Sequence, residues 1–202
     1  ASLDDNPDLP TYALQEKSEN LLRLFGLINR PARFIDPDNP QREICDQAVL
    51  AAFCRVLDQV QPDLVHFHNF HGLTFAMAEE TYRRGIPSCF TPQNYHLIDP
   101  ELYLLKNGLD CWETLDLLIA SDAVARNPEK REVYQRRRDT ALTLLNRWVA
   151  MTRAVSDRQK ELLCRFGADP ERIAVLHQAM PDTDTLWADR ANPVQVDRSV
   201  TL

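Results

Sequence analysis

Three histidines stand close together in the chain, at a spacing that suits a binding or catalytic site. His66, His68 and His71 are spaced H-x-H-x-x-H, and the alternation of side chains along a strand points His66 and His68 to the same side. A neutral imidazole can bind a metal, accept a proton or form a hydrogen bond with a hydroxyl group. The pattern therefore fits metal binding, catalysis or substrate positioning. It also fits histidines that only pack and form structural hydrogen bonds.

A metal site is the least favoured of these interpretations. Zinc hydrolases of the metallo-β-lactamase type carry a similar H-x-H-x-D-H cluster, but Phe70 stands where their Asp would be. This loss removes a ligand for a second metal, and no Asp or Glu lies within the cluster to replace it. We therefore expect no metal, and a metal-dependent hydrolase is kept only as an alternative.

A second polar group follows the next apolar run of the chain. Residues 86–91 predict a strand, and Gln93, Asn94 and His96 come directly after it. Ligands of parallel α/β sheets bind just past the carboxyl ends of the strands. The side chains expected to share one crevice are His68, Asn69, His71, Gln93, Asn94 and His96. The alternative is that Asn94 and His96 only satisfy the backbone of a turn.

The two polar groups flank a predicted strand, helix and strand. Residues 64–67 form an apolar run too short for a helix, and residues 73–84 have the length of a helix that ends before Gly85. Gly72 is expected to open this helix, where free backbone amides could meet an anionic or hydroxylated ligand. The sequence thus predicts a parallel sheet with a binding edge.

The rest of the chain supplies further strands and helices for a Rossmann-like α/β fold, a parallel sheet with helices on both faces. Asn39 and Pro40 predict the start of one helix that runs to Val60, and Ser156 and Gln159 predict a capping box that starts another. Other predicted helices cover residues 21–28 and 113–147, and other predicted strands cover residues 32–35, 148–152, 173–177 and 199–202. Residues 1–20 are expected to be loosely held.

Composition limits the classes of function. The 202 residues are 44% hydrophobic and 26% charged, as in an ordinary soluble domain, and no apolar run is long enough to span a bilayer. A net charge of -7 argues against a nucleic-acid partner, which would need a basic face. Arg136, Arg137 and Arg138 predict a solvated helix face, with peripheral membrane contact as the alternative.

The cysteines indicate the compartment. Five scattered cysteines do not form a disulfide framework, and four lie in apolar segments, so we expect buried, reduced thiols in a cytoplasmic protein.

Three stretches together resemble a known family. PDLVHFHNFHGL, RRGIPSCFTPQNYHLI and AMTRAVSDRQKELLCRFGADPERIAVLHQAMPDT are similar to the N-terminal domain of family 4 glycosyltransferases of the GT-B fold, over about residues 40–187. The resemblance implies an enzyme of two facing Rossmann-like domains, with the acceptor held mainly by the first and the nucleotide sugar mainly by the second. It also implies retention of anomeric configuration, and no metal or cofactor besides the nucleotide-sugar substrate.

Two departures from the family pattern modify this expectation. The Gly-rich loop of the family is not found among the five glycines, and the second domain is not recognised, so we expect a fragment that does not catalyse transfer alone. The expected division is a poorly defined segment (1–38), an incomplete glycosyltransferase domain (39–187) and a linker that starts a second domain (188–202). Where the family has T-x-H-D, this chain has Thr91-Pro92-Gln93-Asn94, and Gln93 cannot act as a general base.

The resemblance assigns roles to the polar residues. Those expected to be catalytic are His71, Gln93 and His96, and those expected to bind the acceptor are His68, Asn69, Gly72 and Asn94. The expected reaction moves a sugar to a glycan or lipid acceptor, in polysaccharide or glycolipid synthesis. The alternative is a non-catalytic α/β association domain, which could form a homodimer through an exposed sheet edge.

Overall fold

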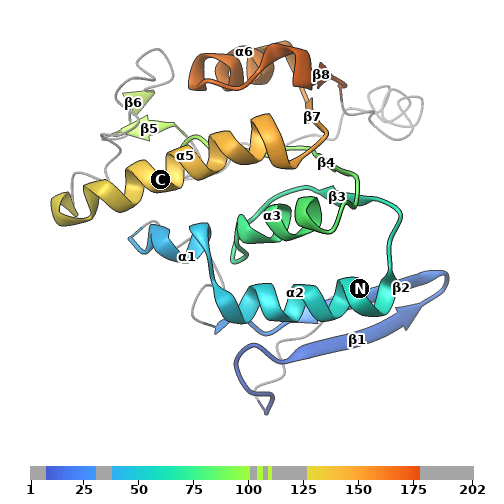
Figure 1. Ribbon diagram of the computed structural model, residues 1–202. Coiled ribbons are helices and arrows are strands. Elements are labelled where there is room, and N and C mark those ends of the chain that lie inside the picture. Colours follow the sequence, from blue (N-terminus) through green and yellow to red (C-terminus); the bar gives the residue numbers. More distant parts are fainter. Residues whose placement is uncertain (1–7, 31–37, 101–103, 107–108, 111–126, 178–202) are drawn as a thin grey trace, which may run out of the picture.

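The computed structural model, which describes residues 8–30, 38–100, 104–106, 109–110 and 127–177, contains a four-stranded parallel sheet (Figure 1). The strands are ordered β3-β4-β7-β8. Their bounds are Val65–Phe67 for β3, Ser88–Phe90 for β4, Met151–Ala154 for β7 and Ile173–Val175 for β8. All three pairs in the sheet are parallel, which confirms the Rossmann-like α/β class.

Each pair of neighbouring strands is joined by a helical segment. The segments are α3 (Ala76–Arg83), then η3 (Pro128–Lys130) with α5 (Arg131–Thr143) and the π-helical turn η4 (Leu144–Trp148), and finally α6 (Asp157–Phe166) with η5 (Pro170–Arg172). The strand predicted from residue 148 therefore begins three residues later, because Trp148 ends the π-helical turn. Within the described ranges, none of the helices is long and apolar enough to cross a bilayer.

The two faces of the sheet differ in burial. Phe67, Phe90 and Ala154 lie on the face that packs into the core, where they are at most 6% exposed. Residues that alternate with them are exposed or only partly buried, including Leu64 at 58% and Met151 at 40% exposure. His66 is aligned with Cys89, and Cys89 with Met151, so His66 lies on this second face.

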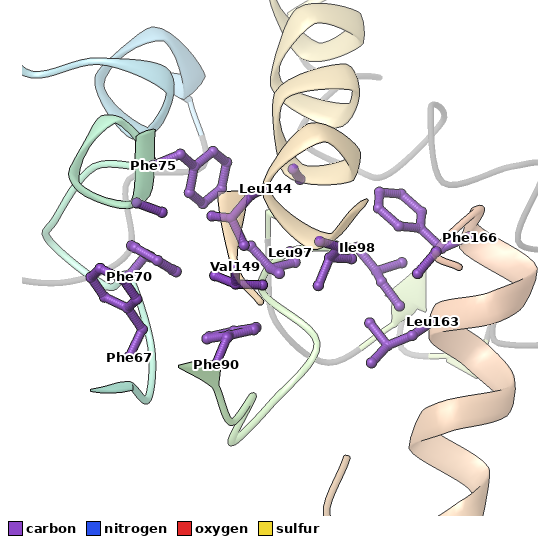
Figure 2. Close-up of a cluster of buried hydrophobic side chains, with 14 of the residues drawn as sticks. Phe67, Phe70, Phe75, Phe90, Leu97, Ile98, Leu144, Val149, Leu163 and Phe166 are labelled. Carbon is purple, nitrogen blue, oxygen red and sulfur yellow. The ribbon is translucent and has the colours of Figure 1, made fainter. Parts of the chain in front are cut away.

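The core joins the end of β3 to the helices. In Figure 2, Phe67, Phe70 and Phe75 lie on one side of the buried cluster and Leu163 and Phe166 of α6 on the other. The Phe70 ring stacks on Phe67, with centroids 5.1 Å apart, and meets Phe75 edge-on at 5.6 Å. Phe70, at the position of the missing Asp, is therefore a core residue.

The helix predicted from Asn39 to Val60 is divided in two. Helix α1 covers Pro40–Ile44 and α2 covers Gln47–Val60, with an extended backbone at Cys45 and Asp46 between them. Pro40 begins α1 as expected, but the Asn39 side chain forms no capping bond. Instead the Asp46 carboxylate accepts the backbone N–H groups of Ala48 and Val49, at 3.1 and 3.2 Å, and starts α2. The prediction of one helix was wrong because a capping side chain in its middle was missed.

The N-terminal part is a β-hairpin, so the helix predicted at 21–28 was wrong. Strands β1 (Leu14–Glu19) and β2 (Leu22–Leu27) pair antiparallel around Asn20, whose φ is 54°. The Arg23 guanidinium and the Glu16 carboxylate form an ion pair at 2.8 Å across it. Cross-strand pairing thus overrides the helix-like apolar spacing. A second, short hairpin joins β5 (Leu105–Lys106) and β6 (Leu109–Asp110).

Some predictions lie outside the described residues. These are the strands at 32–35 and 199–202, residues 113–126 of a predicted helix, the linker at 188–202 and Cys111. The four described cysteines are free thiols. Cys54, Cys89 and Cys164 are partly buried, whereas Cys45 is exposed, which corrects its predicted burial.

The N-cap of α6 gives a testable stability prediction. Ser156 Oγ accepts the Gln159 backbone N–H at 3.1 Å, while Gln159 Oε1 accepts from Val155, one residue before the cap. We expect Ser156→Ala to lower the free energy of unfolding by about 1 kcal/mol, because a helix N–H loses its partner. Urea unfolding measures this, with Ser156→Asn as the capping control. An equal loss in both variants would contradict the assignment.

Candidate functional site

The polar residues expected to share one crevice fall into two groups. An exposed group, His66, His68 and Gln93, lies at the carboxyl ends of β3 and β4. An interior group, His71, Asn94 and His96, lies where the two following loops meet the helices. The histidine spacing alone could not separate them, because the turn at 69–72 carries His71 away from the strand direction.

The exposed group is held by contacts between the ends of the two strands. The rings of His66 and His68 have centroids 4.1 Å apart. Gln93 Nε2 lies 3.3 Å from His68 Nδ1, and His66 Nε2 lies 2.8 Å from Thr91 Oγ1. His68 and Gln93 therefore meet on this edge, as predicted. His66 has a bonded imidazole but is exposed, not packed within the sheet.

The interior group is built around two histidine rings in contact. The His71 and His96 rings meet edge-on, with centroids 4.8 Å apart and an angle of 81°. Asn94 Nδ2 lies 3.5 Å from His71 Nε2, and Asn94 Oδ1 accepts the His96 backbone N–H at 2.9 Å. Asn69 Oδ1 accepts the His71 backbone N–H at 3.2 Å. Both asparagines thus satisfy turn backbone, and Asn94 also reaches a histidine ring.

A buried charge network lies behind the interior group. Glu43 Oε1 is 3.1 Å from His96 Nε2, and Glu43 Oε2 accepts a hydrogen bond from Arg137 Nε. Arg137 also donates to the backbone carbonyls of His96 and Leu97. Arg137 is 2% exposed and His96 4%. Buried charged side chains of α1 and α5 therefore hold the loop that follows β4.

The solvated face predicted for the three arginines of α5 is wrong for Arg137. Arg136 is exposed, and the Arg138 guanidinium lies over the Phe166 ring at 5.5 Å, but Arg137 points into the core. A signal in the sequence could have found it, because Tyr134, Arg137 and Ala141 share the helical spacing of one buried stripe. The sequence carried no comparable signal for Glu43, which lies in the five-residue helix α1.

The charges in this network shift the protonation equilibria of two groups. Burial alone would raise the pKa of Glu43, but the positive charges of Arg137 and His96 outweigh it, and the pKa is lowered. Burial lowers the pKa of His71, and positive charge on His96 lowers it further, against the opposing effect of Glu43. Glu43 is therefore an ionised carboxylate at neutral pH, and His71 is a neutral imidazole that can accept a proton or a hydrogen bond.

Gly72 does not open helix α3, which begins at Ala76. Gly72 lies in the preceding turn with a φ of 62°, and its carbonyl accepts a hydrogen bond from Asn29 Nδ2. Two amides at the start of the helix are also occupied, since Phe75 N donates to the Glu43 carbonyl and Met77 N to that of Thr74. The expected row of free amides at this helix start is therefore incomplete.

The histidines do not converge as a metal site would require. In the described part of the chain, no group of three or more His, Cys, Asp or Glu side chains is placed to hold one ion. His66 pairs with His68, whereas His71 pairs with His96. The H-x-H-x-x-H spacing is divided between the two groups.

The Glu43 carboxylate predicts acid sensitivity of the fold. Because its pKa is lowered in the folded chain, its stabilising contribution is complete above its unfolded pKa and is lost as the pH falls through the folded value. We expect the free energy of unfolding to decrease from neutral pH to below pH of about 4. In Glu43→Gln, stability should be lower at neutral pH but depend less on acid. Urea unfolding across this range measures both, and parallel curves would contradict the prediction.

The sequence matches the model of a known protein family. A family model described as a glycosyl transferase 4-like domain matches residues 21–179, which is most of the chain and includes both polar groups. The match begins at the hairpin, earlier than residue 40, where the resemblance starts. No curated protein and no solved structure matches the chain significantly.

Proposed function

Because this chain belongs to the glycosyl transferase 4-like family, we propose that it is the acceptor-side part of a retaining glycosyltransferase. The complete enzyme would move a sugar from a nucleotide-sugar donor to a hydroxyl group of a glycan or lipid acceptor, in polysaccharide or glycolipid synthesis. The donor would be held mainly by a second domain of the same enzyme, and no metal or further cofactor is needed.

One observation besides the family match supports this proposal. Polar side chains from two adjacent parallel strands gather just past the carboxyl ends of β3 and β4, the edge at which α/β sheets bind their ligands. Gln93 bridges to His68, and Asn94 to His71, so each loop contributes to both groups. Neutral imidazoles and amides are the groups that bind sugar hydroxyls by hydrogen bonding.

The chemistry follows from the accessibility of these groups. During transfer, the acceptor oxygen bonds to the anomeric carbon, the bond from that carbon to the nucleotide diphosphate breaks so that the diphosphate leaves, and the hydroxyl proton would pass to the His71 imidazole. His71 is half-buried and neutral, so we assign to it the hydrogen bond to this hydroxyl. His68, Asn69, Gln93 and Asn94 would hold the rest of the acceptor. His96 is too enclosed to touch a substrate here, and we assign it a positioning role.

The test is a transfer assay on the natural protein that contains this chain. The protein is incubated with UDP, GDP and ADP sugars and with a panel of glycan and polyprenyl-phosphate acceptors, and products are detected by mass spectrometry. We expect a glycosylated acceptor with the anomeric configuration of the donor. No transfer, with binding only to another protein or a second copy, would favour the association domain instead.

A further inference from the structure

Glu43 of helix α1 contacts the interior group of histidines, whose members lie in the loops after β3 and β4. Its carboxylate lies 3.1 Å from His96 Nε2, and the His96 ring packs edge-on against His71 with centroids 4.8 Å apart. We infer that Glu43 is a positioning residue of the candidate site: it anchors His96 against His71 and so fixes the position of the His71 ring. This inference rests on the proposed function only for the role of His71 toward the acceptor.

Glu43 reaches both loops of the site at once. Its backbone carbonyl accepts the Phe75 N–H at 2.7 Å and the Thr74 hydroxyl at 3.1 Å, which fixes the segment that follows His71. Its side chain holds the loop after β4 through His96. One residue of α1 therefore fixes the distance between the two loops whose histidines meet.

Arg137 of α5 compensates the cost of burying the Glu43 carboxylate. A buried carboxylate is costly unless it is paired and fully hydrogen-bonded. Arg137 supplies the opposite charge, donates to two carbonyls of the loop and lies 5.4 Å from the centre of the Phe75 ring. The pair thus supports the two loops and does not merely fill the core.

The second ring nitrogen of His96 indicates more than a structural role. His96 Nδ1 is buried and has no hydrogen-bond partner, although Nε2 is occupied by Glu43. An unsatisfied buried polar atom is destabilising, and a site selected for stability alone would avoid it.

Two charged groups act on His71, and they act in opposite directions. His96, from the loop after β4, lowers the pKa of His71 when it is protonated, and Glu43, from α1, raises it. Arg137 faces Glu43 from α5 and balances its charge. Removing Glu43 should therefore lower the pKa of His71, and removing His96 should raise it. A variant that only loosens the site would expose His71 and raise its pKa in both cases.

The experiment is an NMR titration of the His71 ring signal in the natural protein, assigned with His71→Gln. We expect the midpoint to fall in Glu43→Gln and to rise toward the ordinary histidine value in His96→Gln. Glu43→Asp, which keeps the charge, should stay close to the unmodified protein. Upward shifts in both neutral variants, or no shift in either, would overturn the inference.

Two features keep this test decisive. If Glu43→Gln does not fold, His96→Gln still retains the buried Glu43 and Arg137 pair, and an unchanged or lower His71 midpoint in that variant would overturn the inference. The titration also needs no enzymatic activity. If the transfer assay fails while the midpoints shift as expected, the positioning holds and the proposed function does not. If transfer is found, its pH profile should move with the His71 midpoint.

Discussion

We expect Arg137→Met to lower the free energy of unfolding by about 3–5 kcal/mol, the largest stability effect predicted for this chain. Arg137 is 2% exposed, and its removal leaves the Glu43 carboxylate buried without its main counter-charge. It also frees the carbonyls of His96 and Leu97. Methionine keeps the apolar stem, so the loss reports the missing charge and hydrogen bonds more than a cavity.

The neighbouring residue supplies a matched control for this measurement. Arg136 lies on the same helix but is exposed, so Arg136→Met should change stability by no more than about 0.5 kcal/mol. In urea unfolding, the two variants should therefore differ by several kcal/mol although each removes one arginine. In the Arg137→Met protein, the further change Glu43→Gln should lower the free energy of unfolding by less than Glu43→Gln does in the unmodified protein. The reason is that it removes the carboxylate that Arg137→Met leaves unpaired. Equal losses in Arg136→Met and Arg137→Met would contradict the buried network.

The central sheet could be predicted from the sequence because its strands are marked by local signals. Residues 64–67 and 86–91 are short apolar runs, and Ser156 and Gly167 mark the two ends of α6. Each of these signals lies within or next to the element that it predicts. The hairpin at Leu14–Leu27 could not be predicted in the same way. Its stability comes from pairing between two strands, while the apolar residues of the second strand also fit a helix.

The candidate site was predicted only in part, for a related reason. The carboxyl edge of the sheet, with His68 and Gln93 in contact, follows from strand order. The interior group depends on residues far apart in the chain, since Glu43 and Arg137 are 94 positions apart. A charged residue is usually assigned to solvent, and only the stripe shared with Tyr134 and Ala141 indicated otherwise for Arg137. Contacts between residues far apart in the sequence therefore determine which histidines belong to the exposed group and which to the interior group.

We expect His71→Gln to lower kcat for sugar transfer by about 100-fold or more, which is the usual effect of removing a group that takes part in proton transfer. Glutamine keeps a polar side chain next to Asn94 but has no nitrogen that can accept a proton. Because His71 is half-buried and outside the Glu43 and Arg137 pair, the free energy of unfolding should change little. The fall should therefore appear in kcat with the protein still folded.

His177 provides the matched control for the loss of activity. It is exposed just past the end of β8 and is not among the residues of either polar group, so His177→Gln should retain the kcat of the unmodified protein. His68→Gln, in the exposed group, should mainly raise KM if that group holds the acceptor. The opposite outcome, an unchanged kcat in His71→Gln and a large loss in His68→Gln, would move the reacting hydroxyl to the exposed group. The interior histidines would then be structural supports for the exposed group.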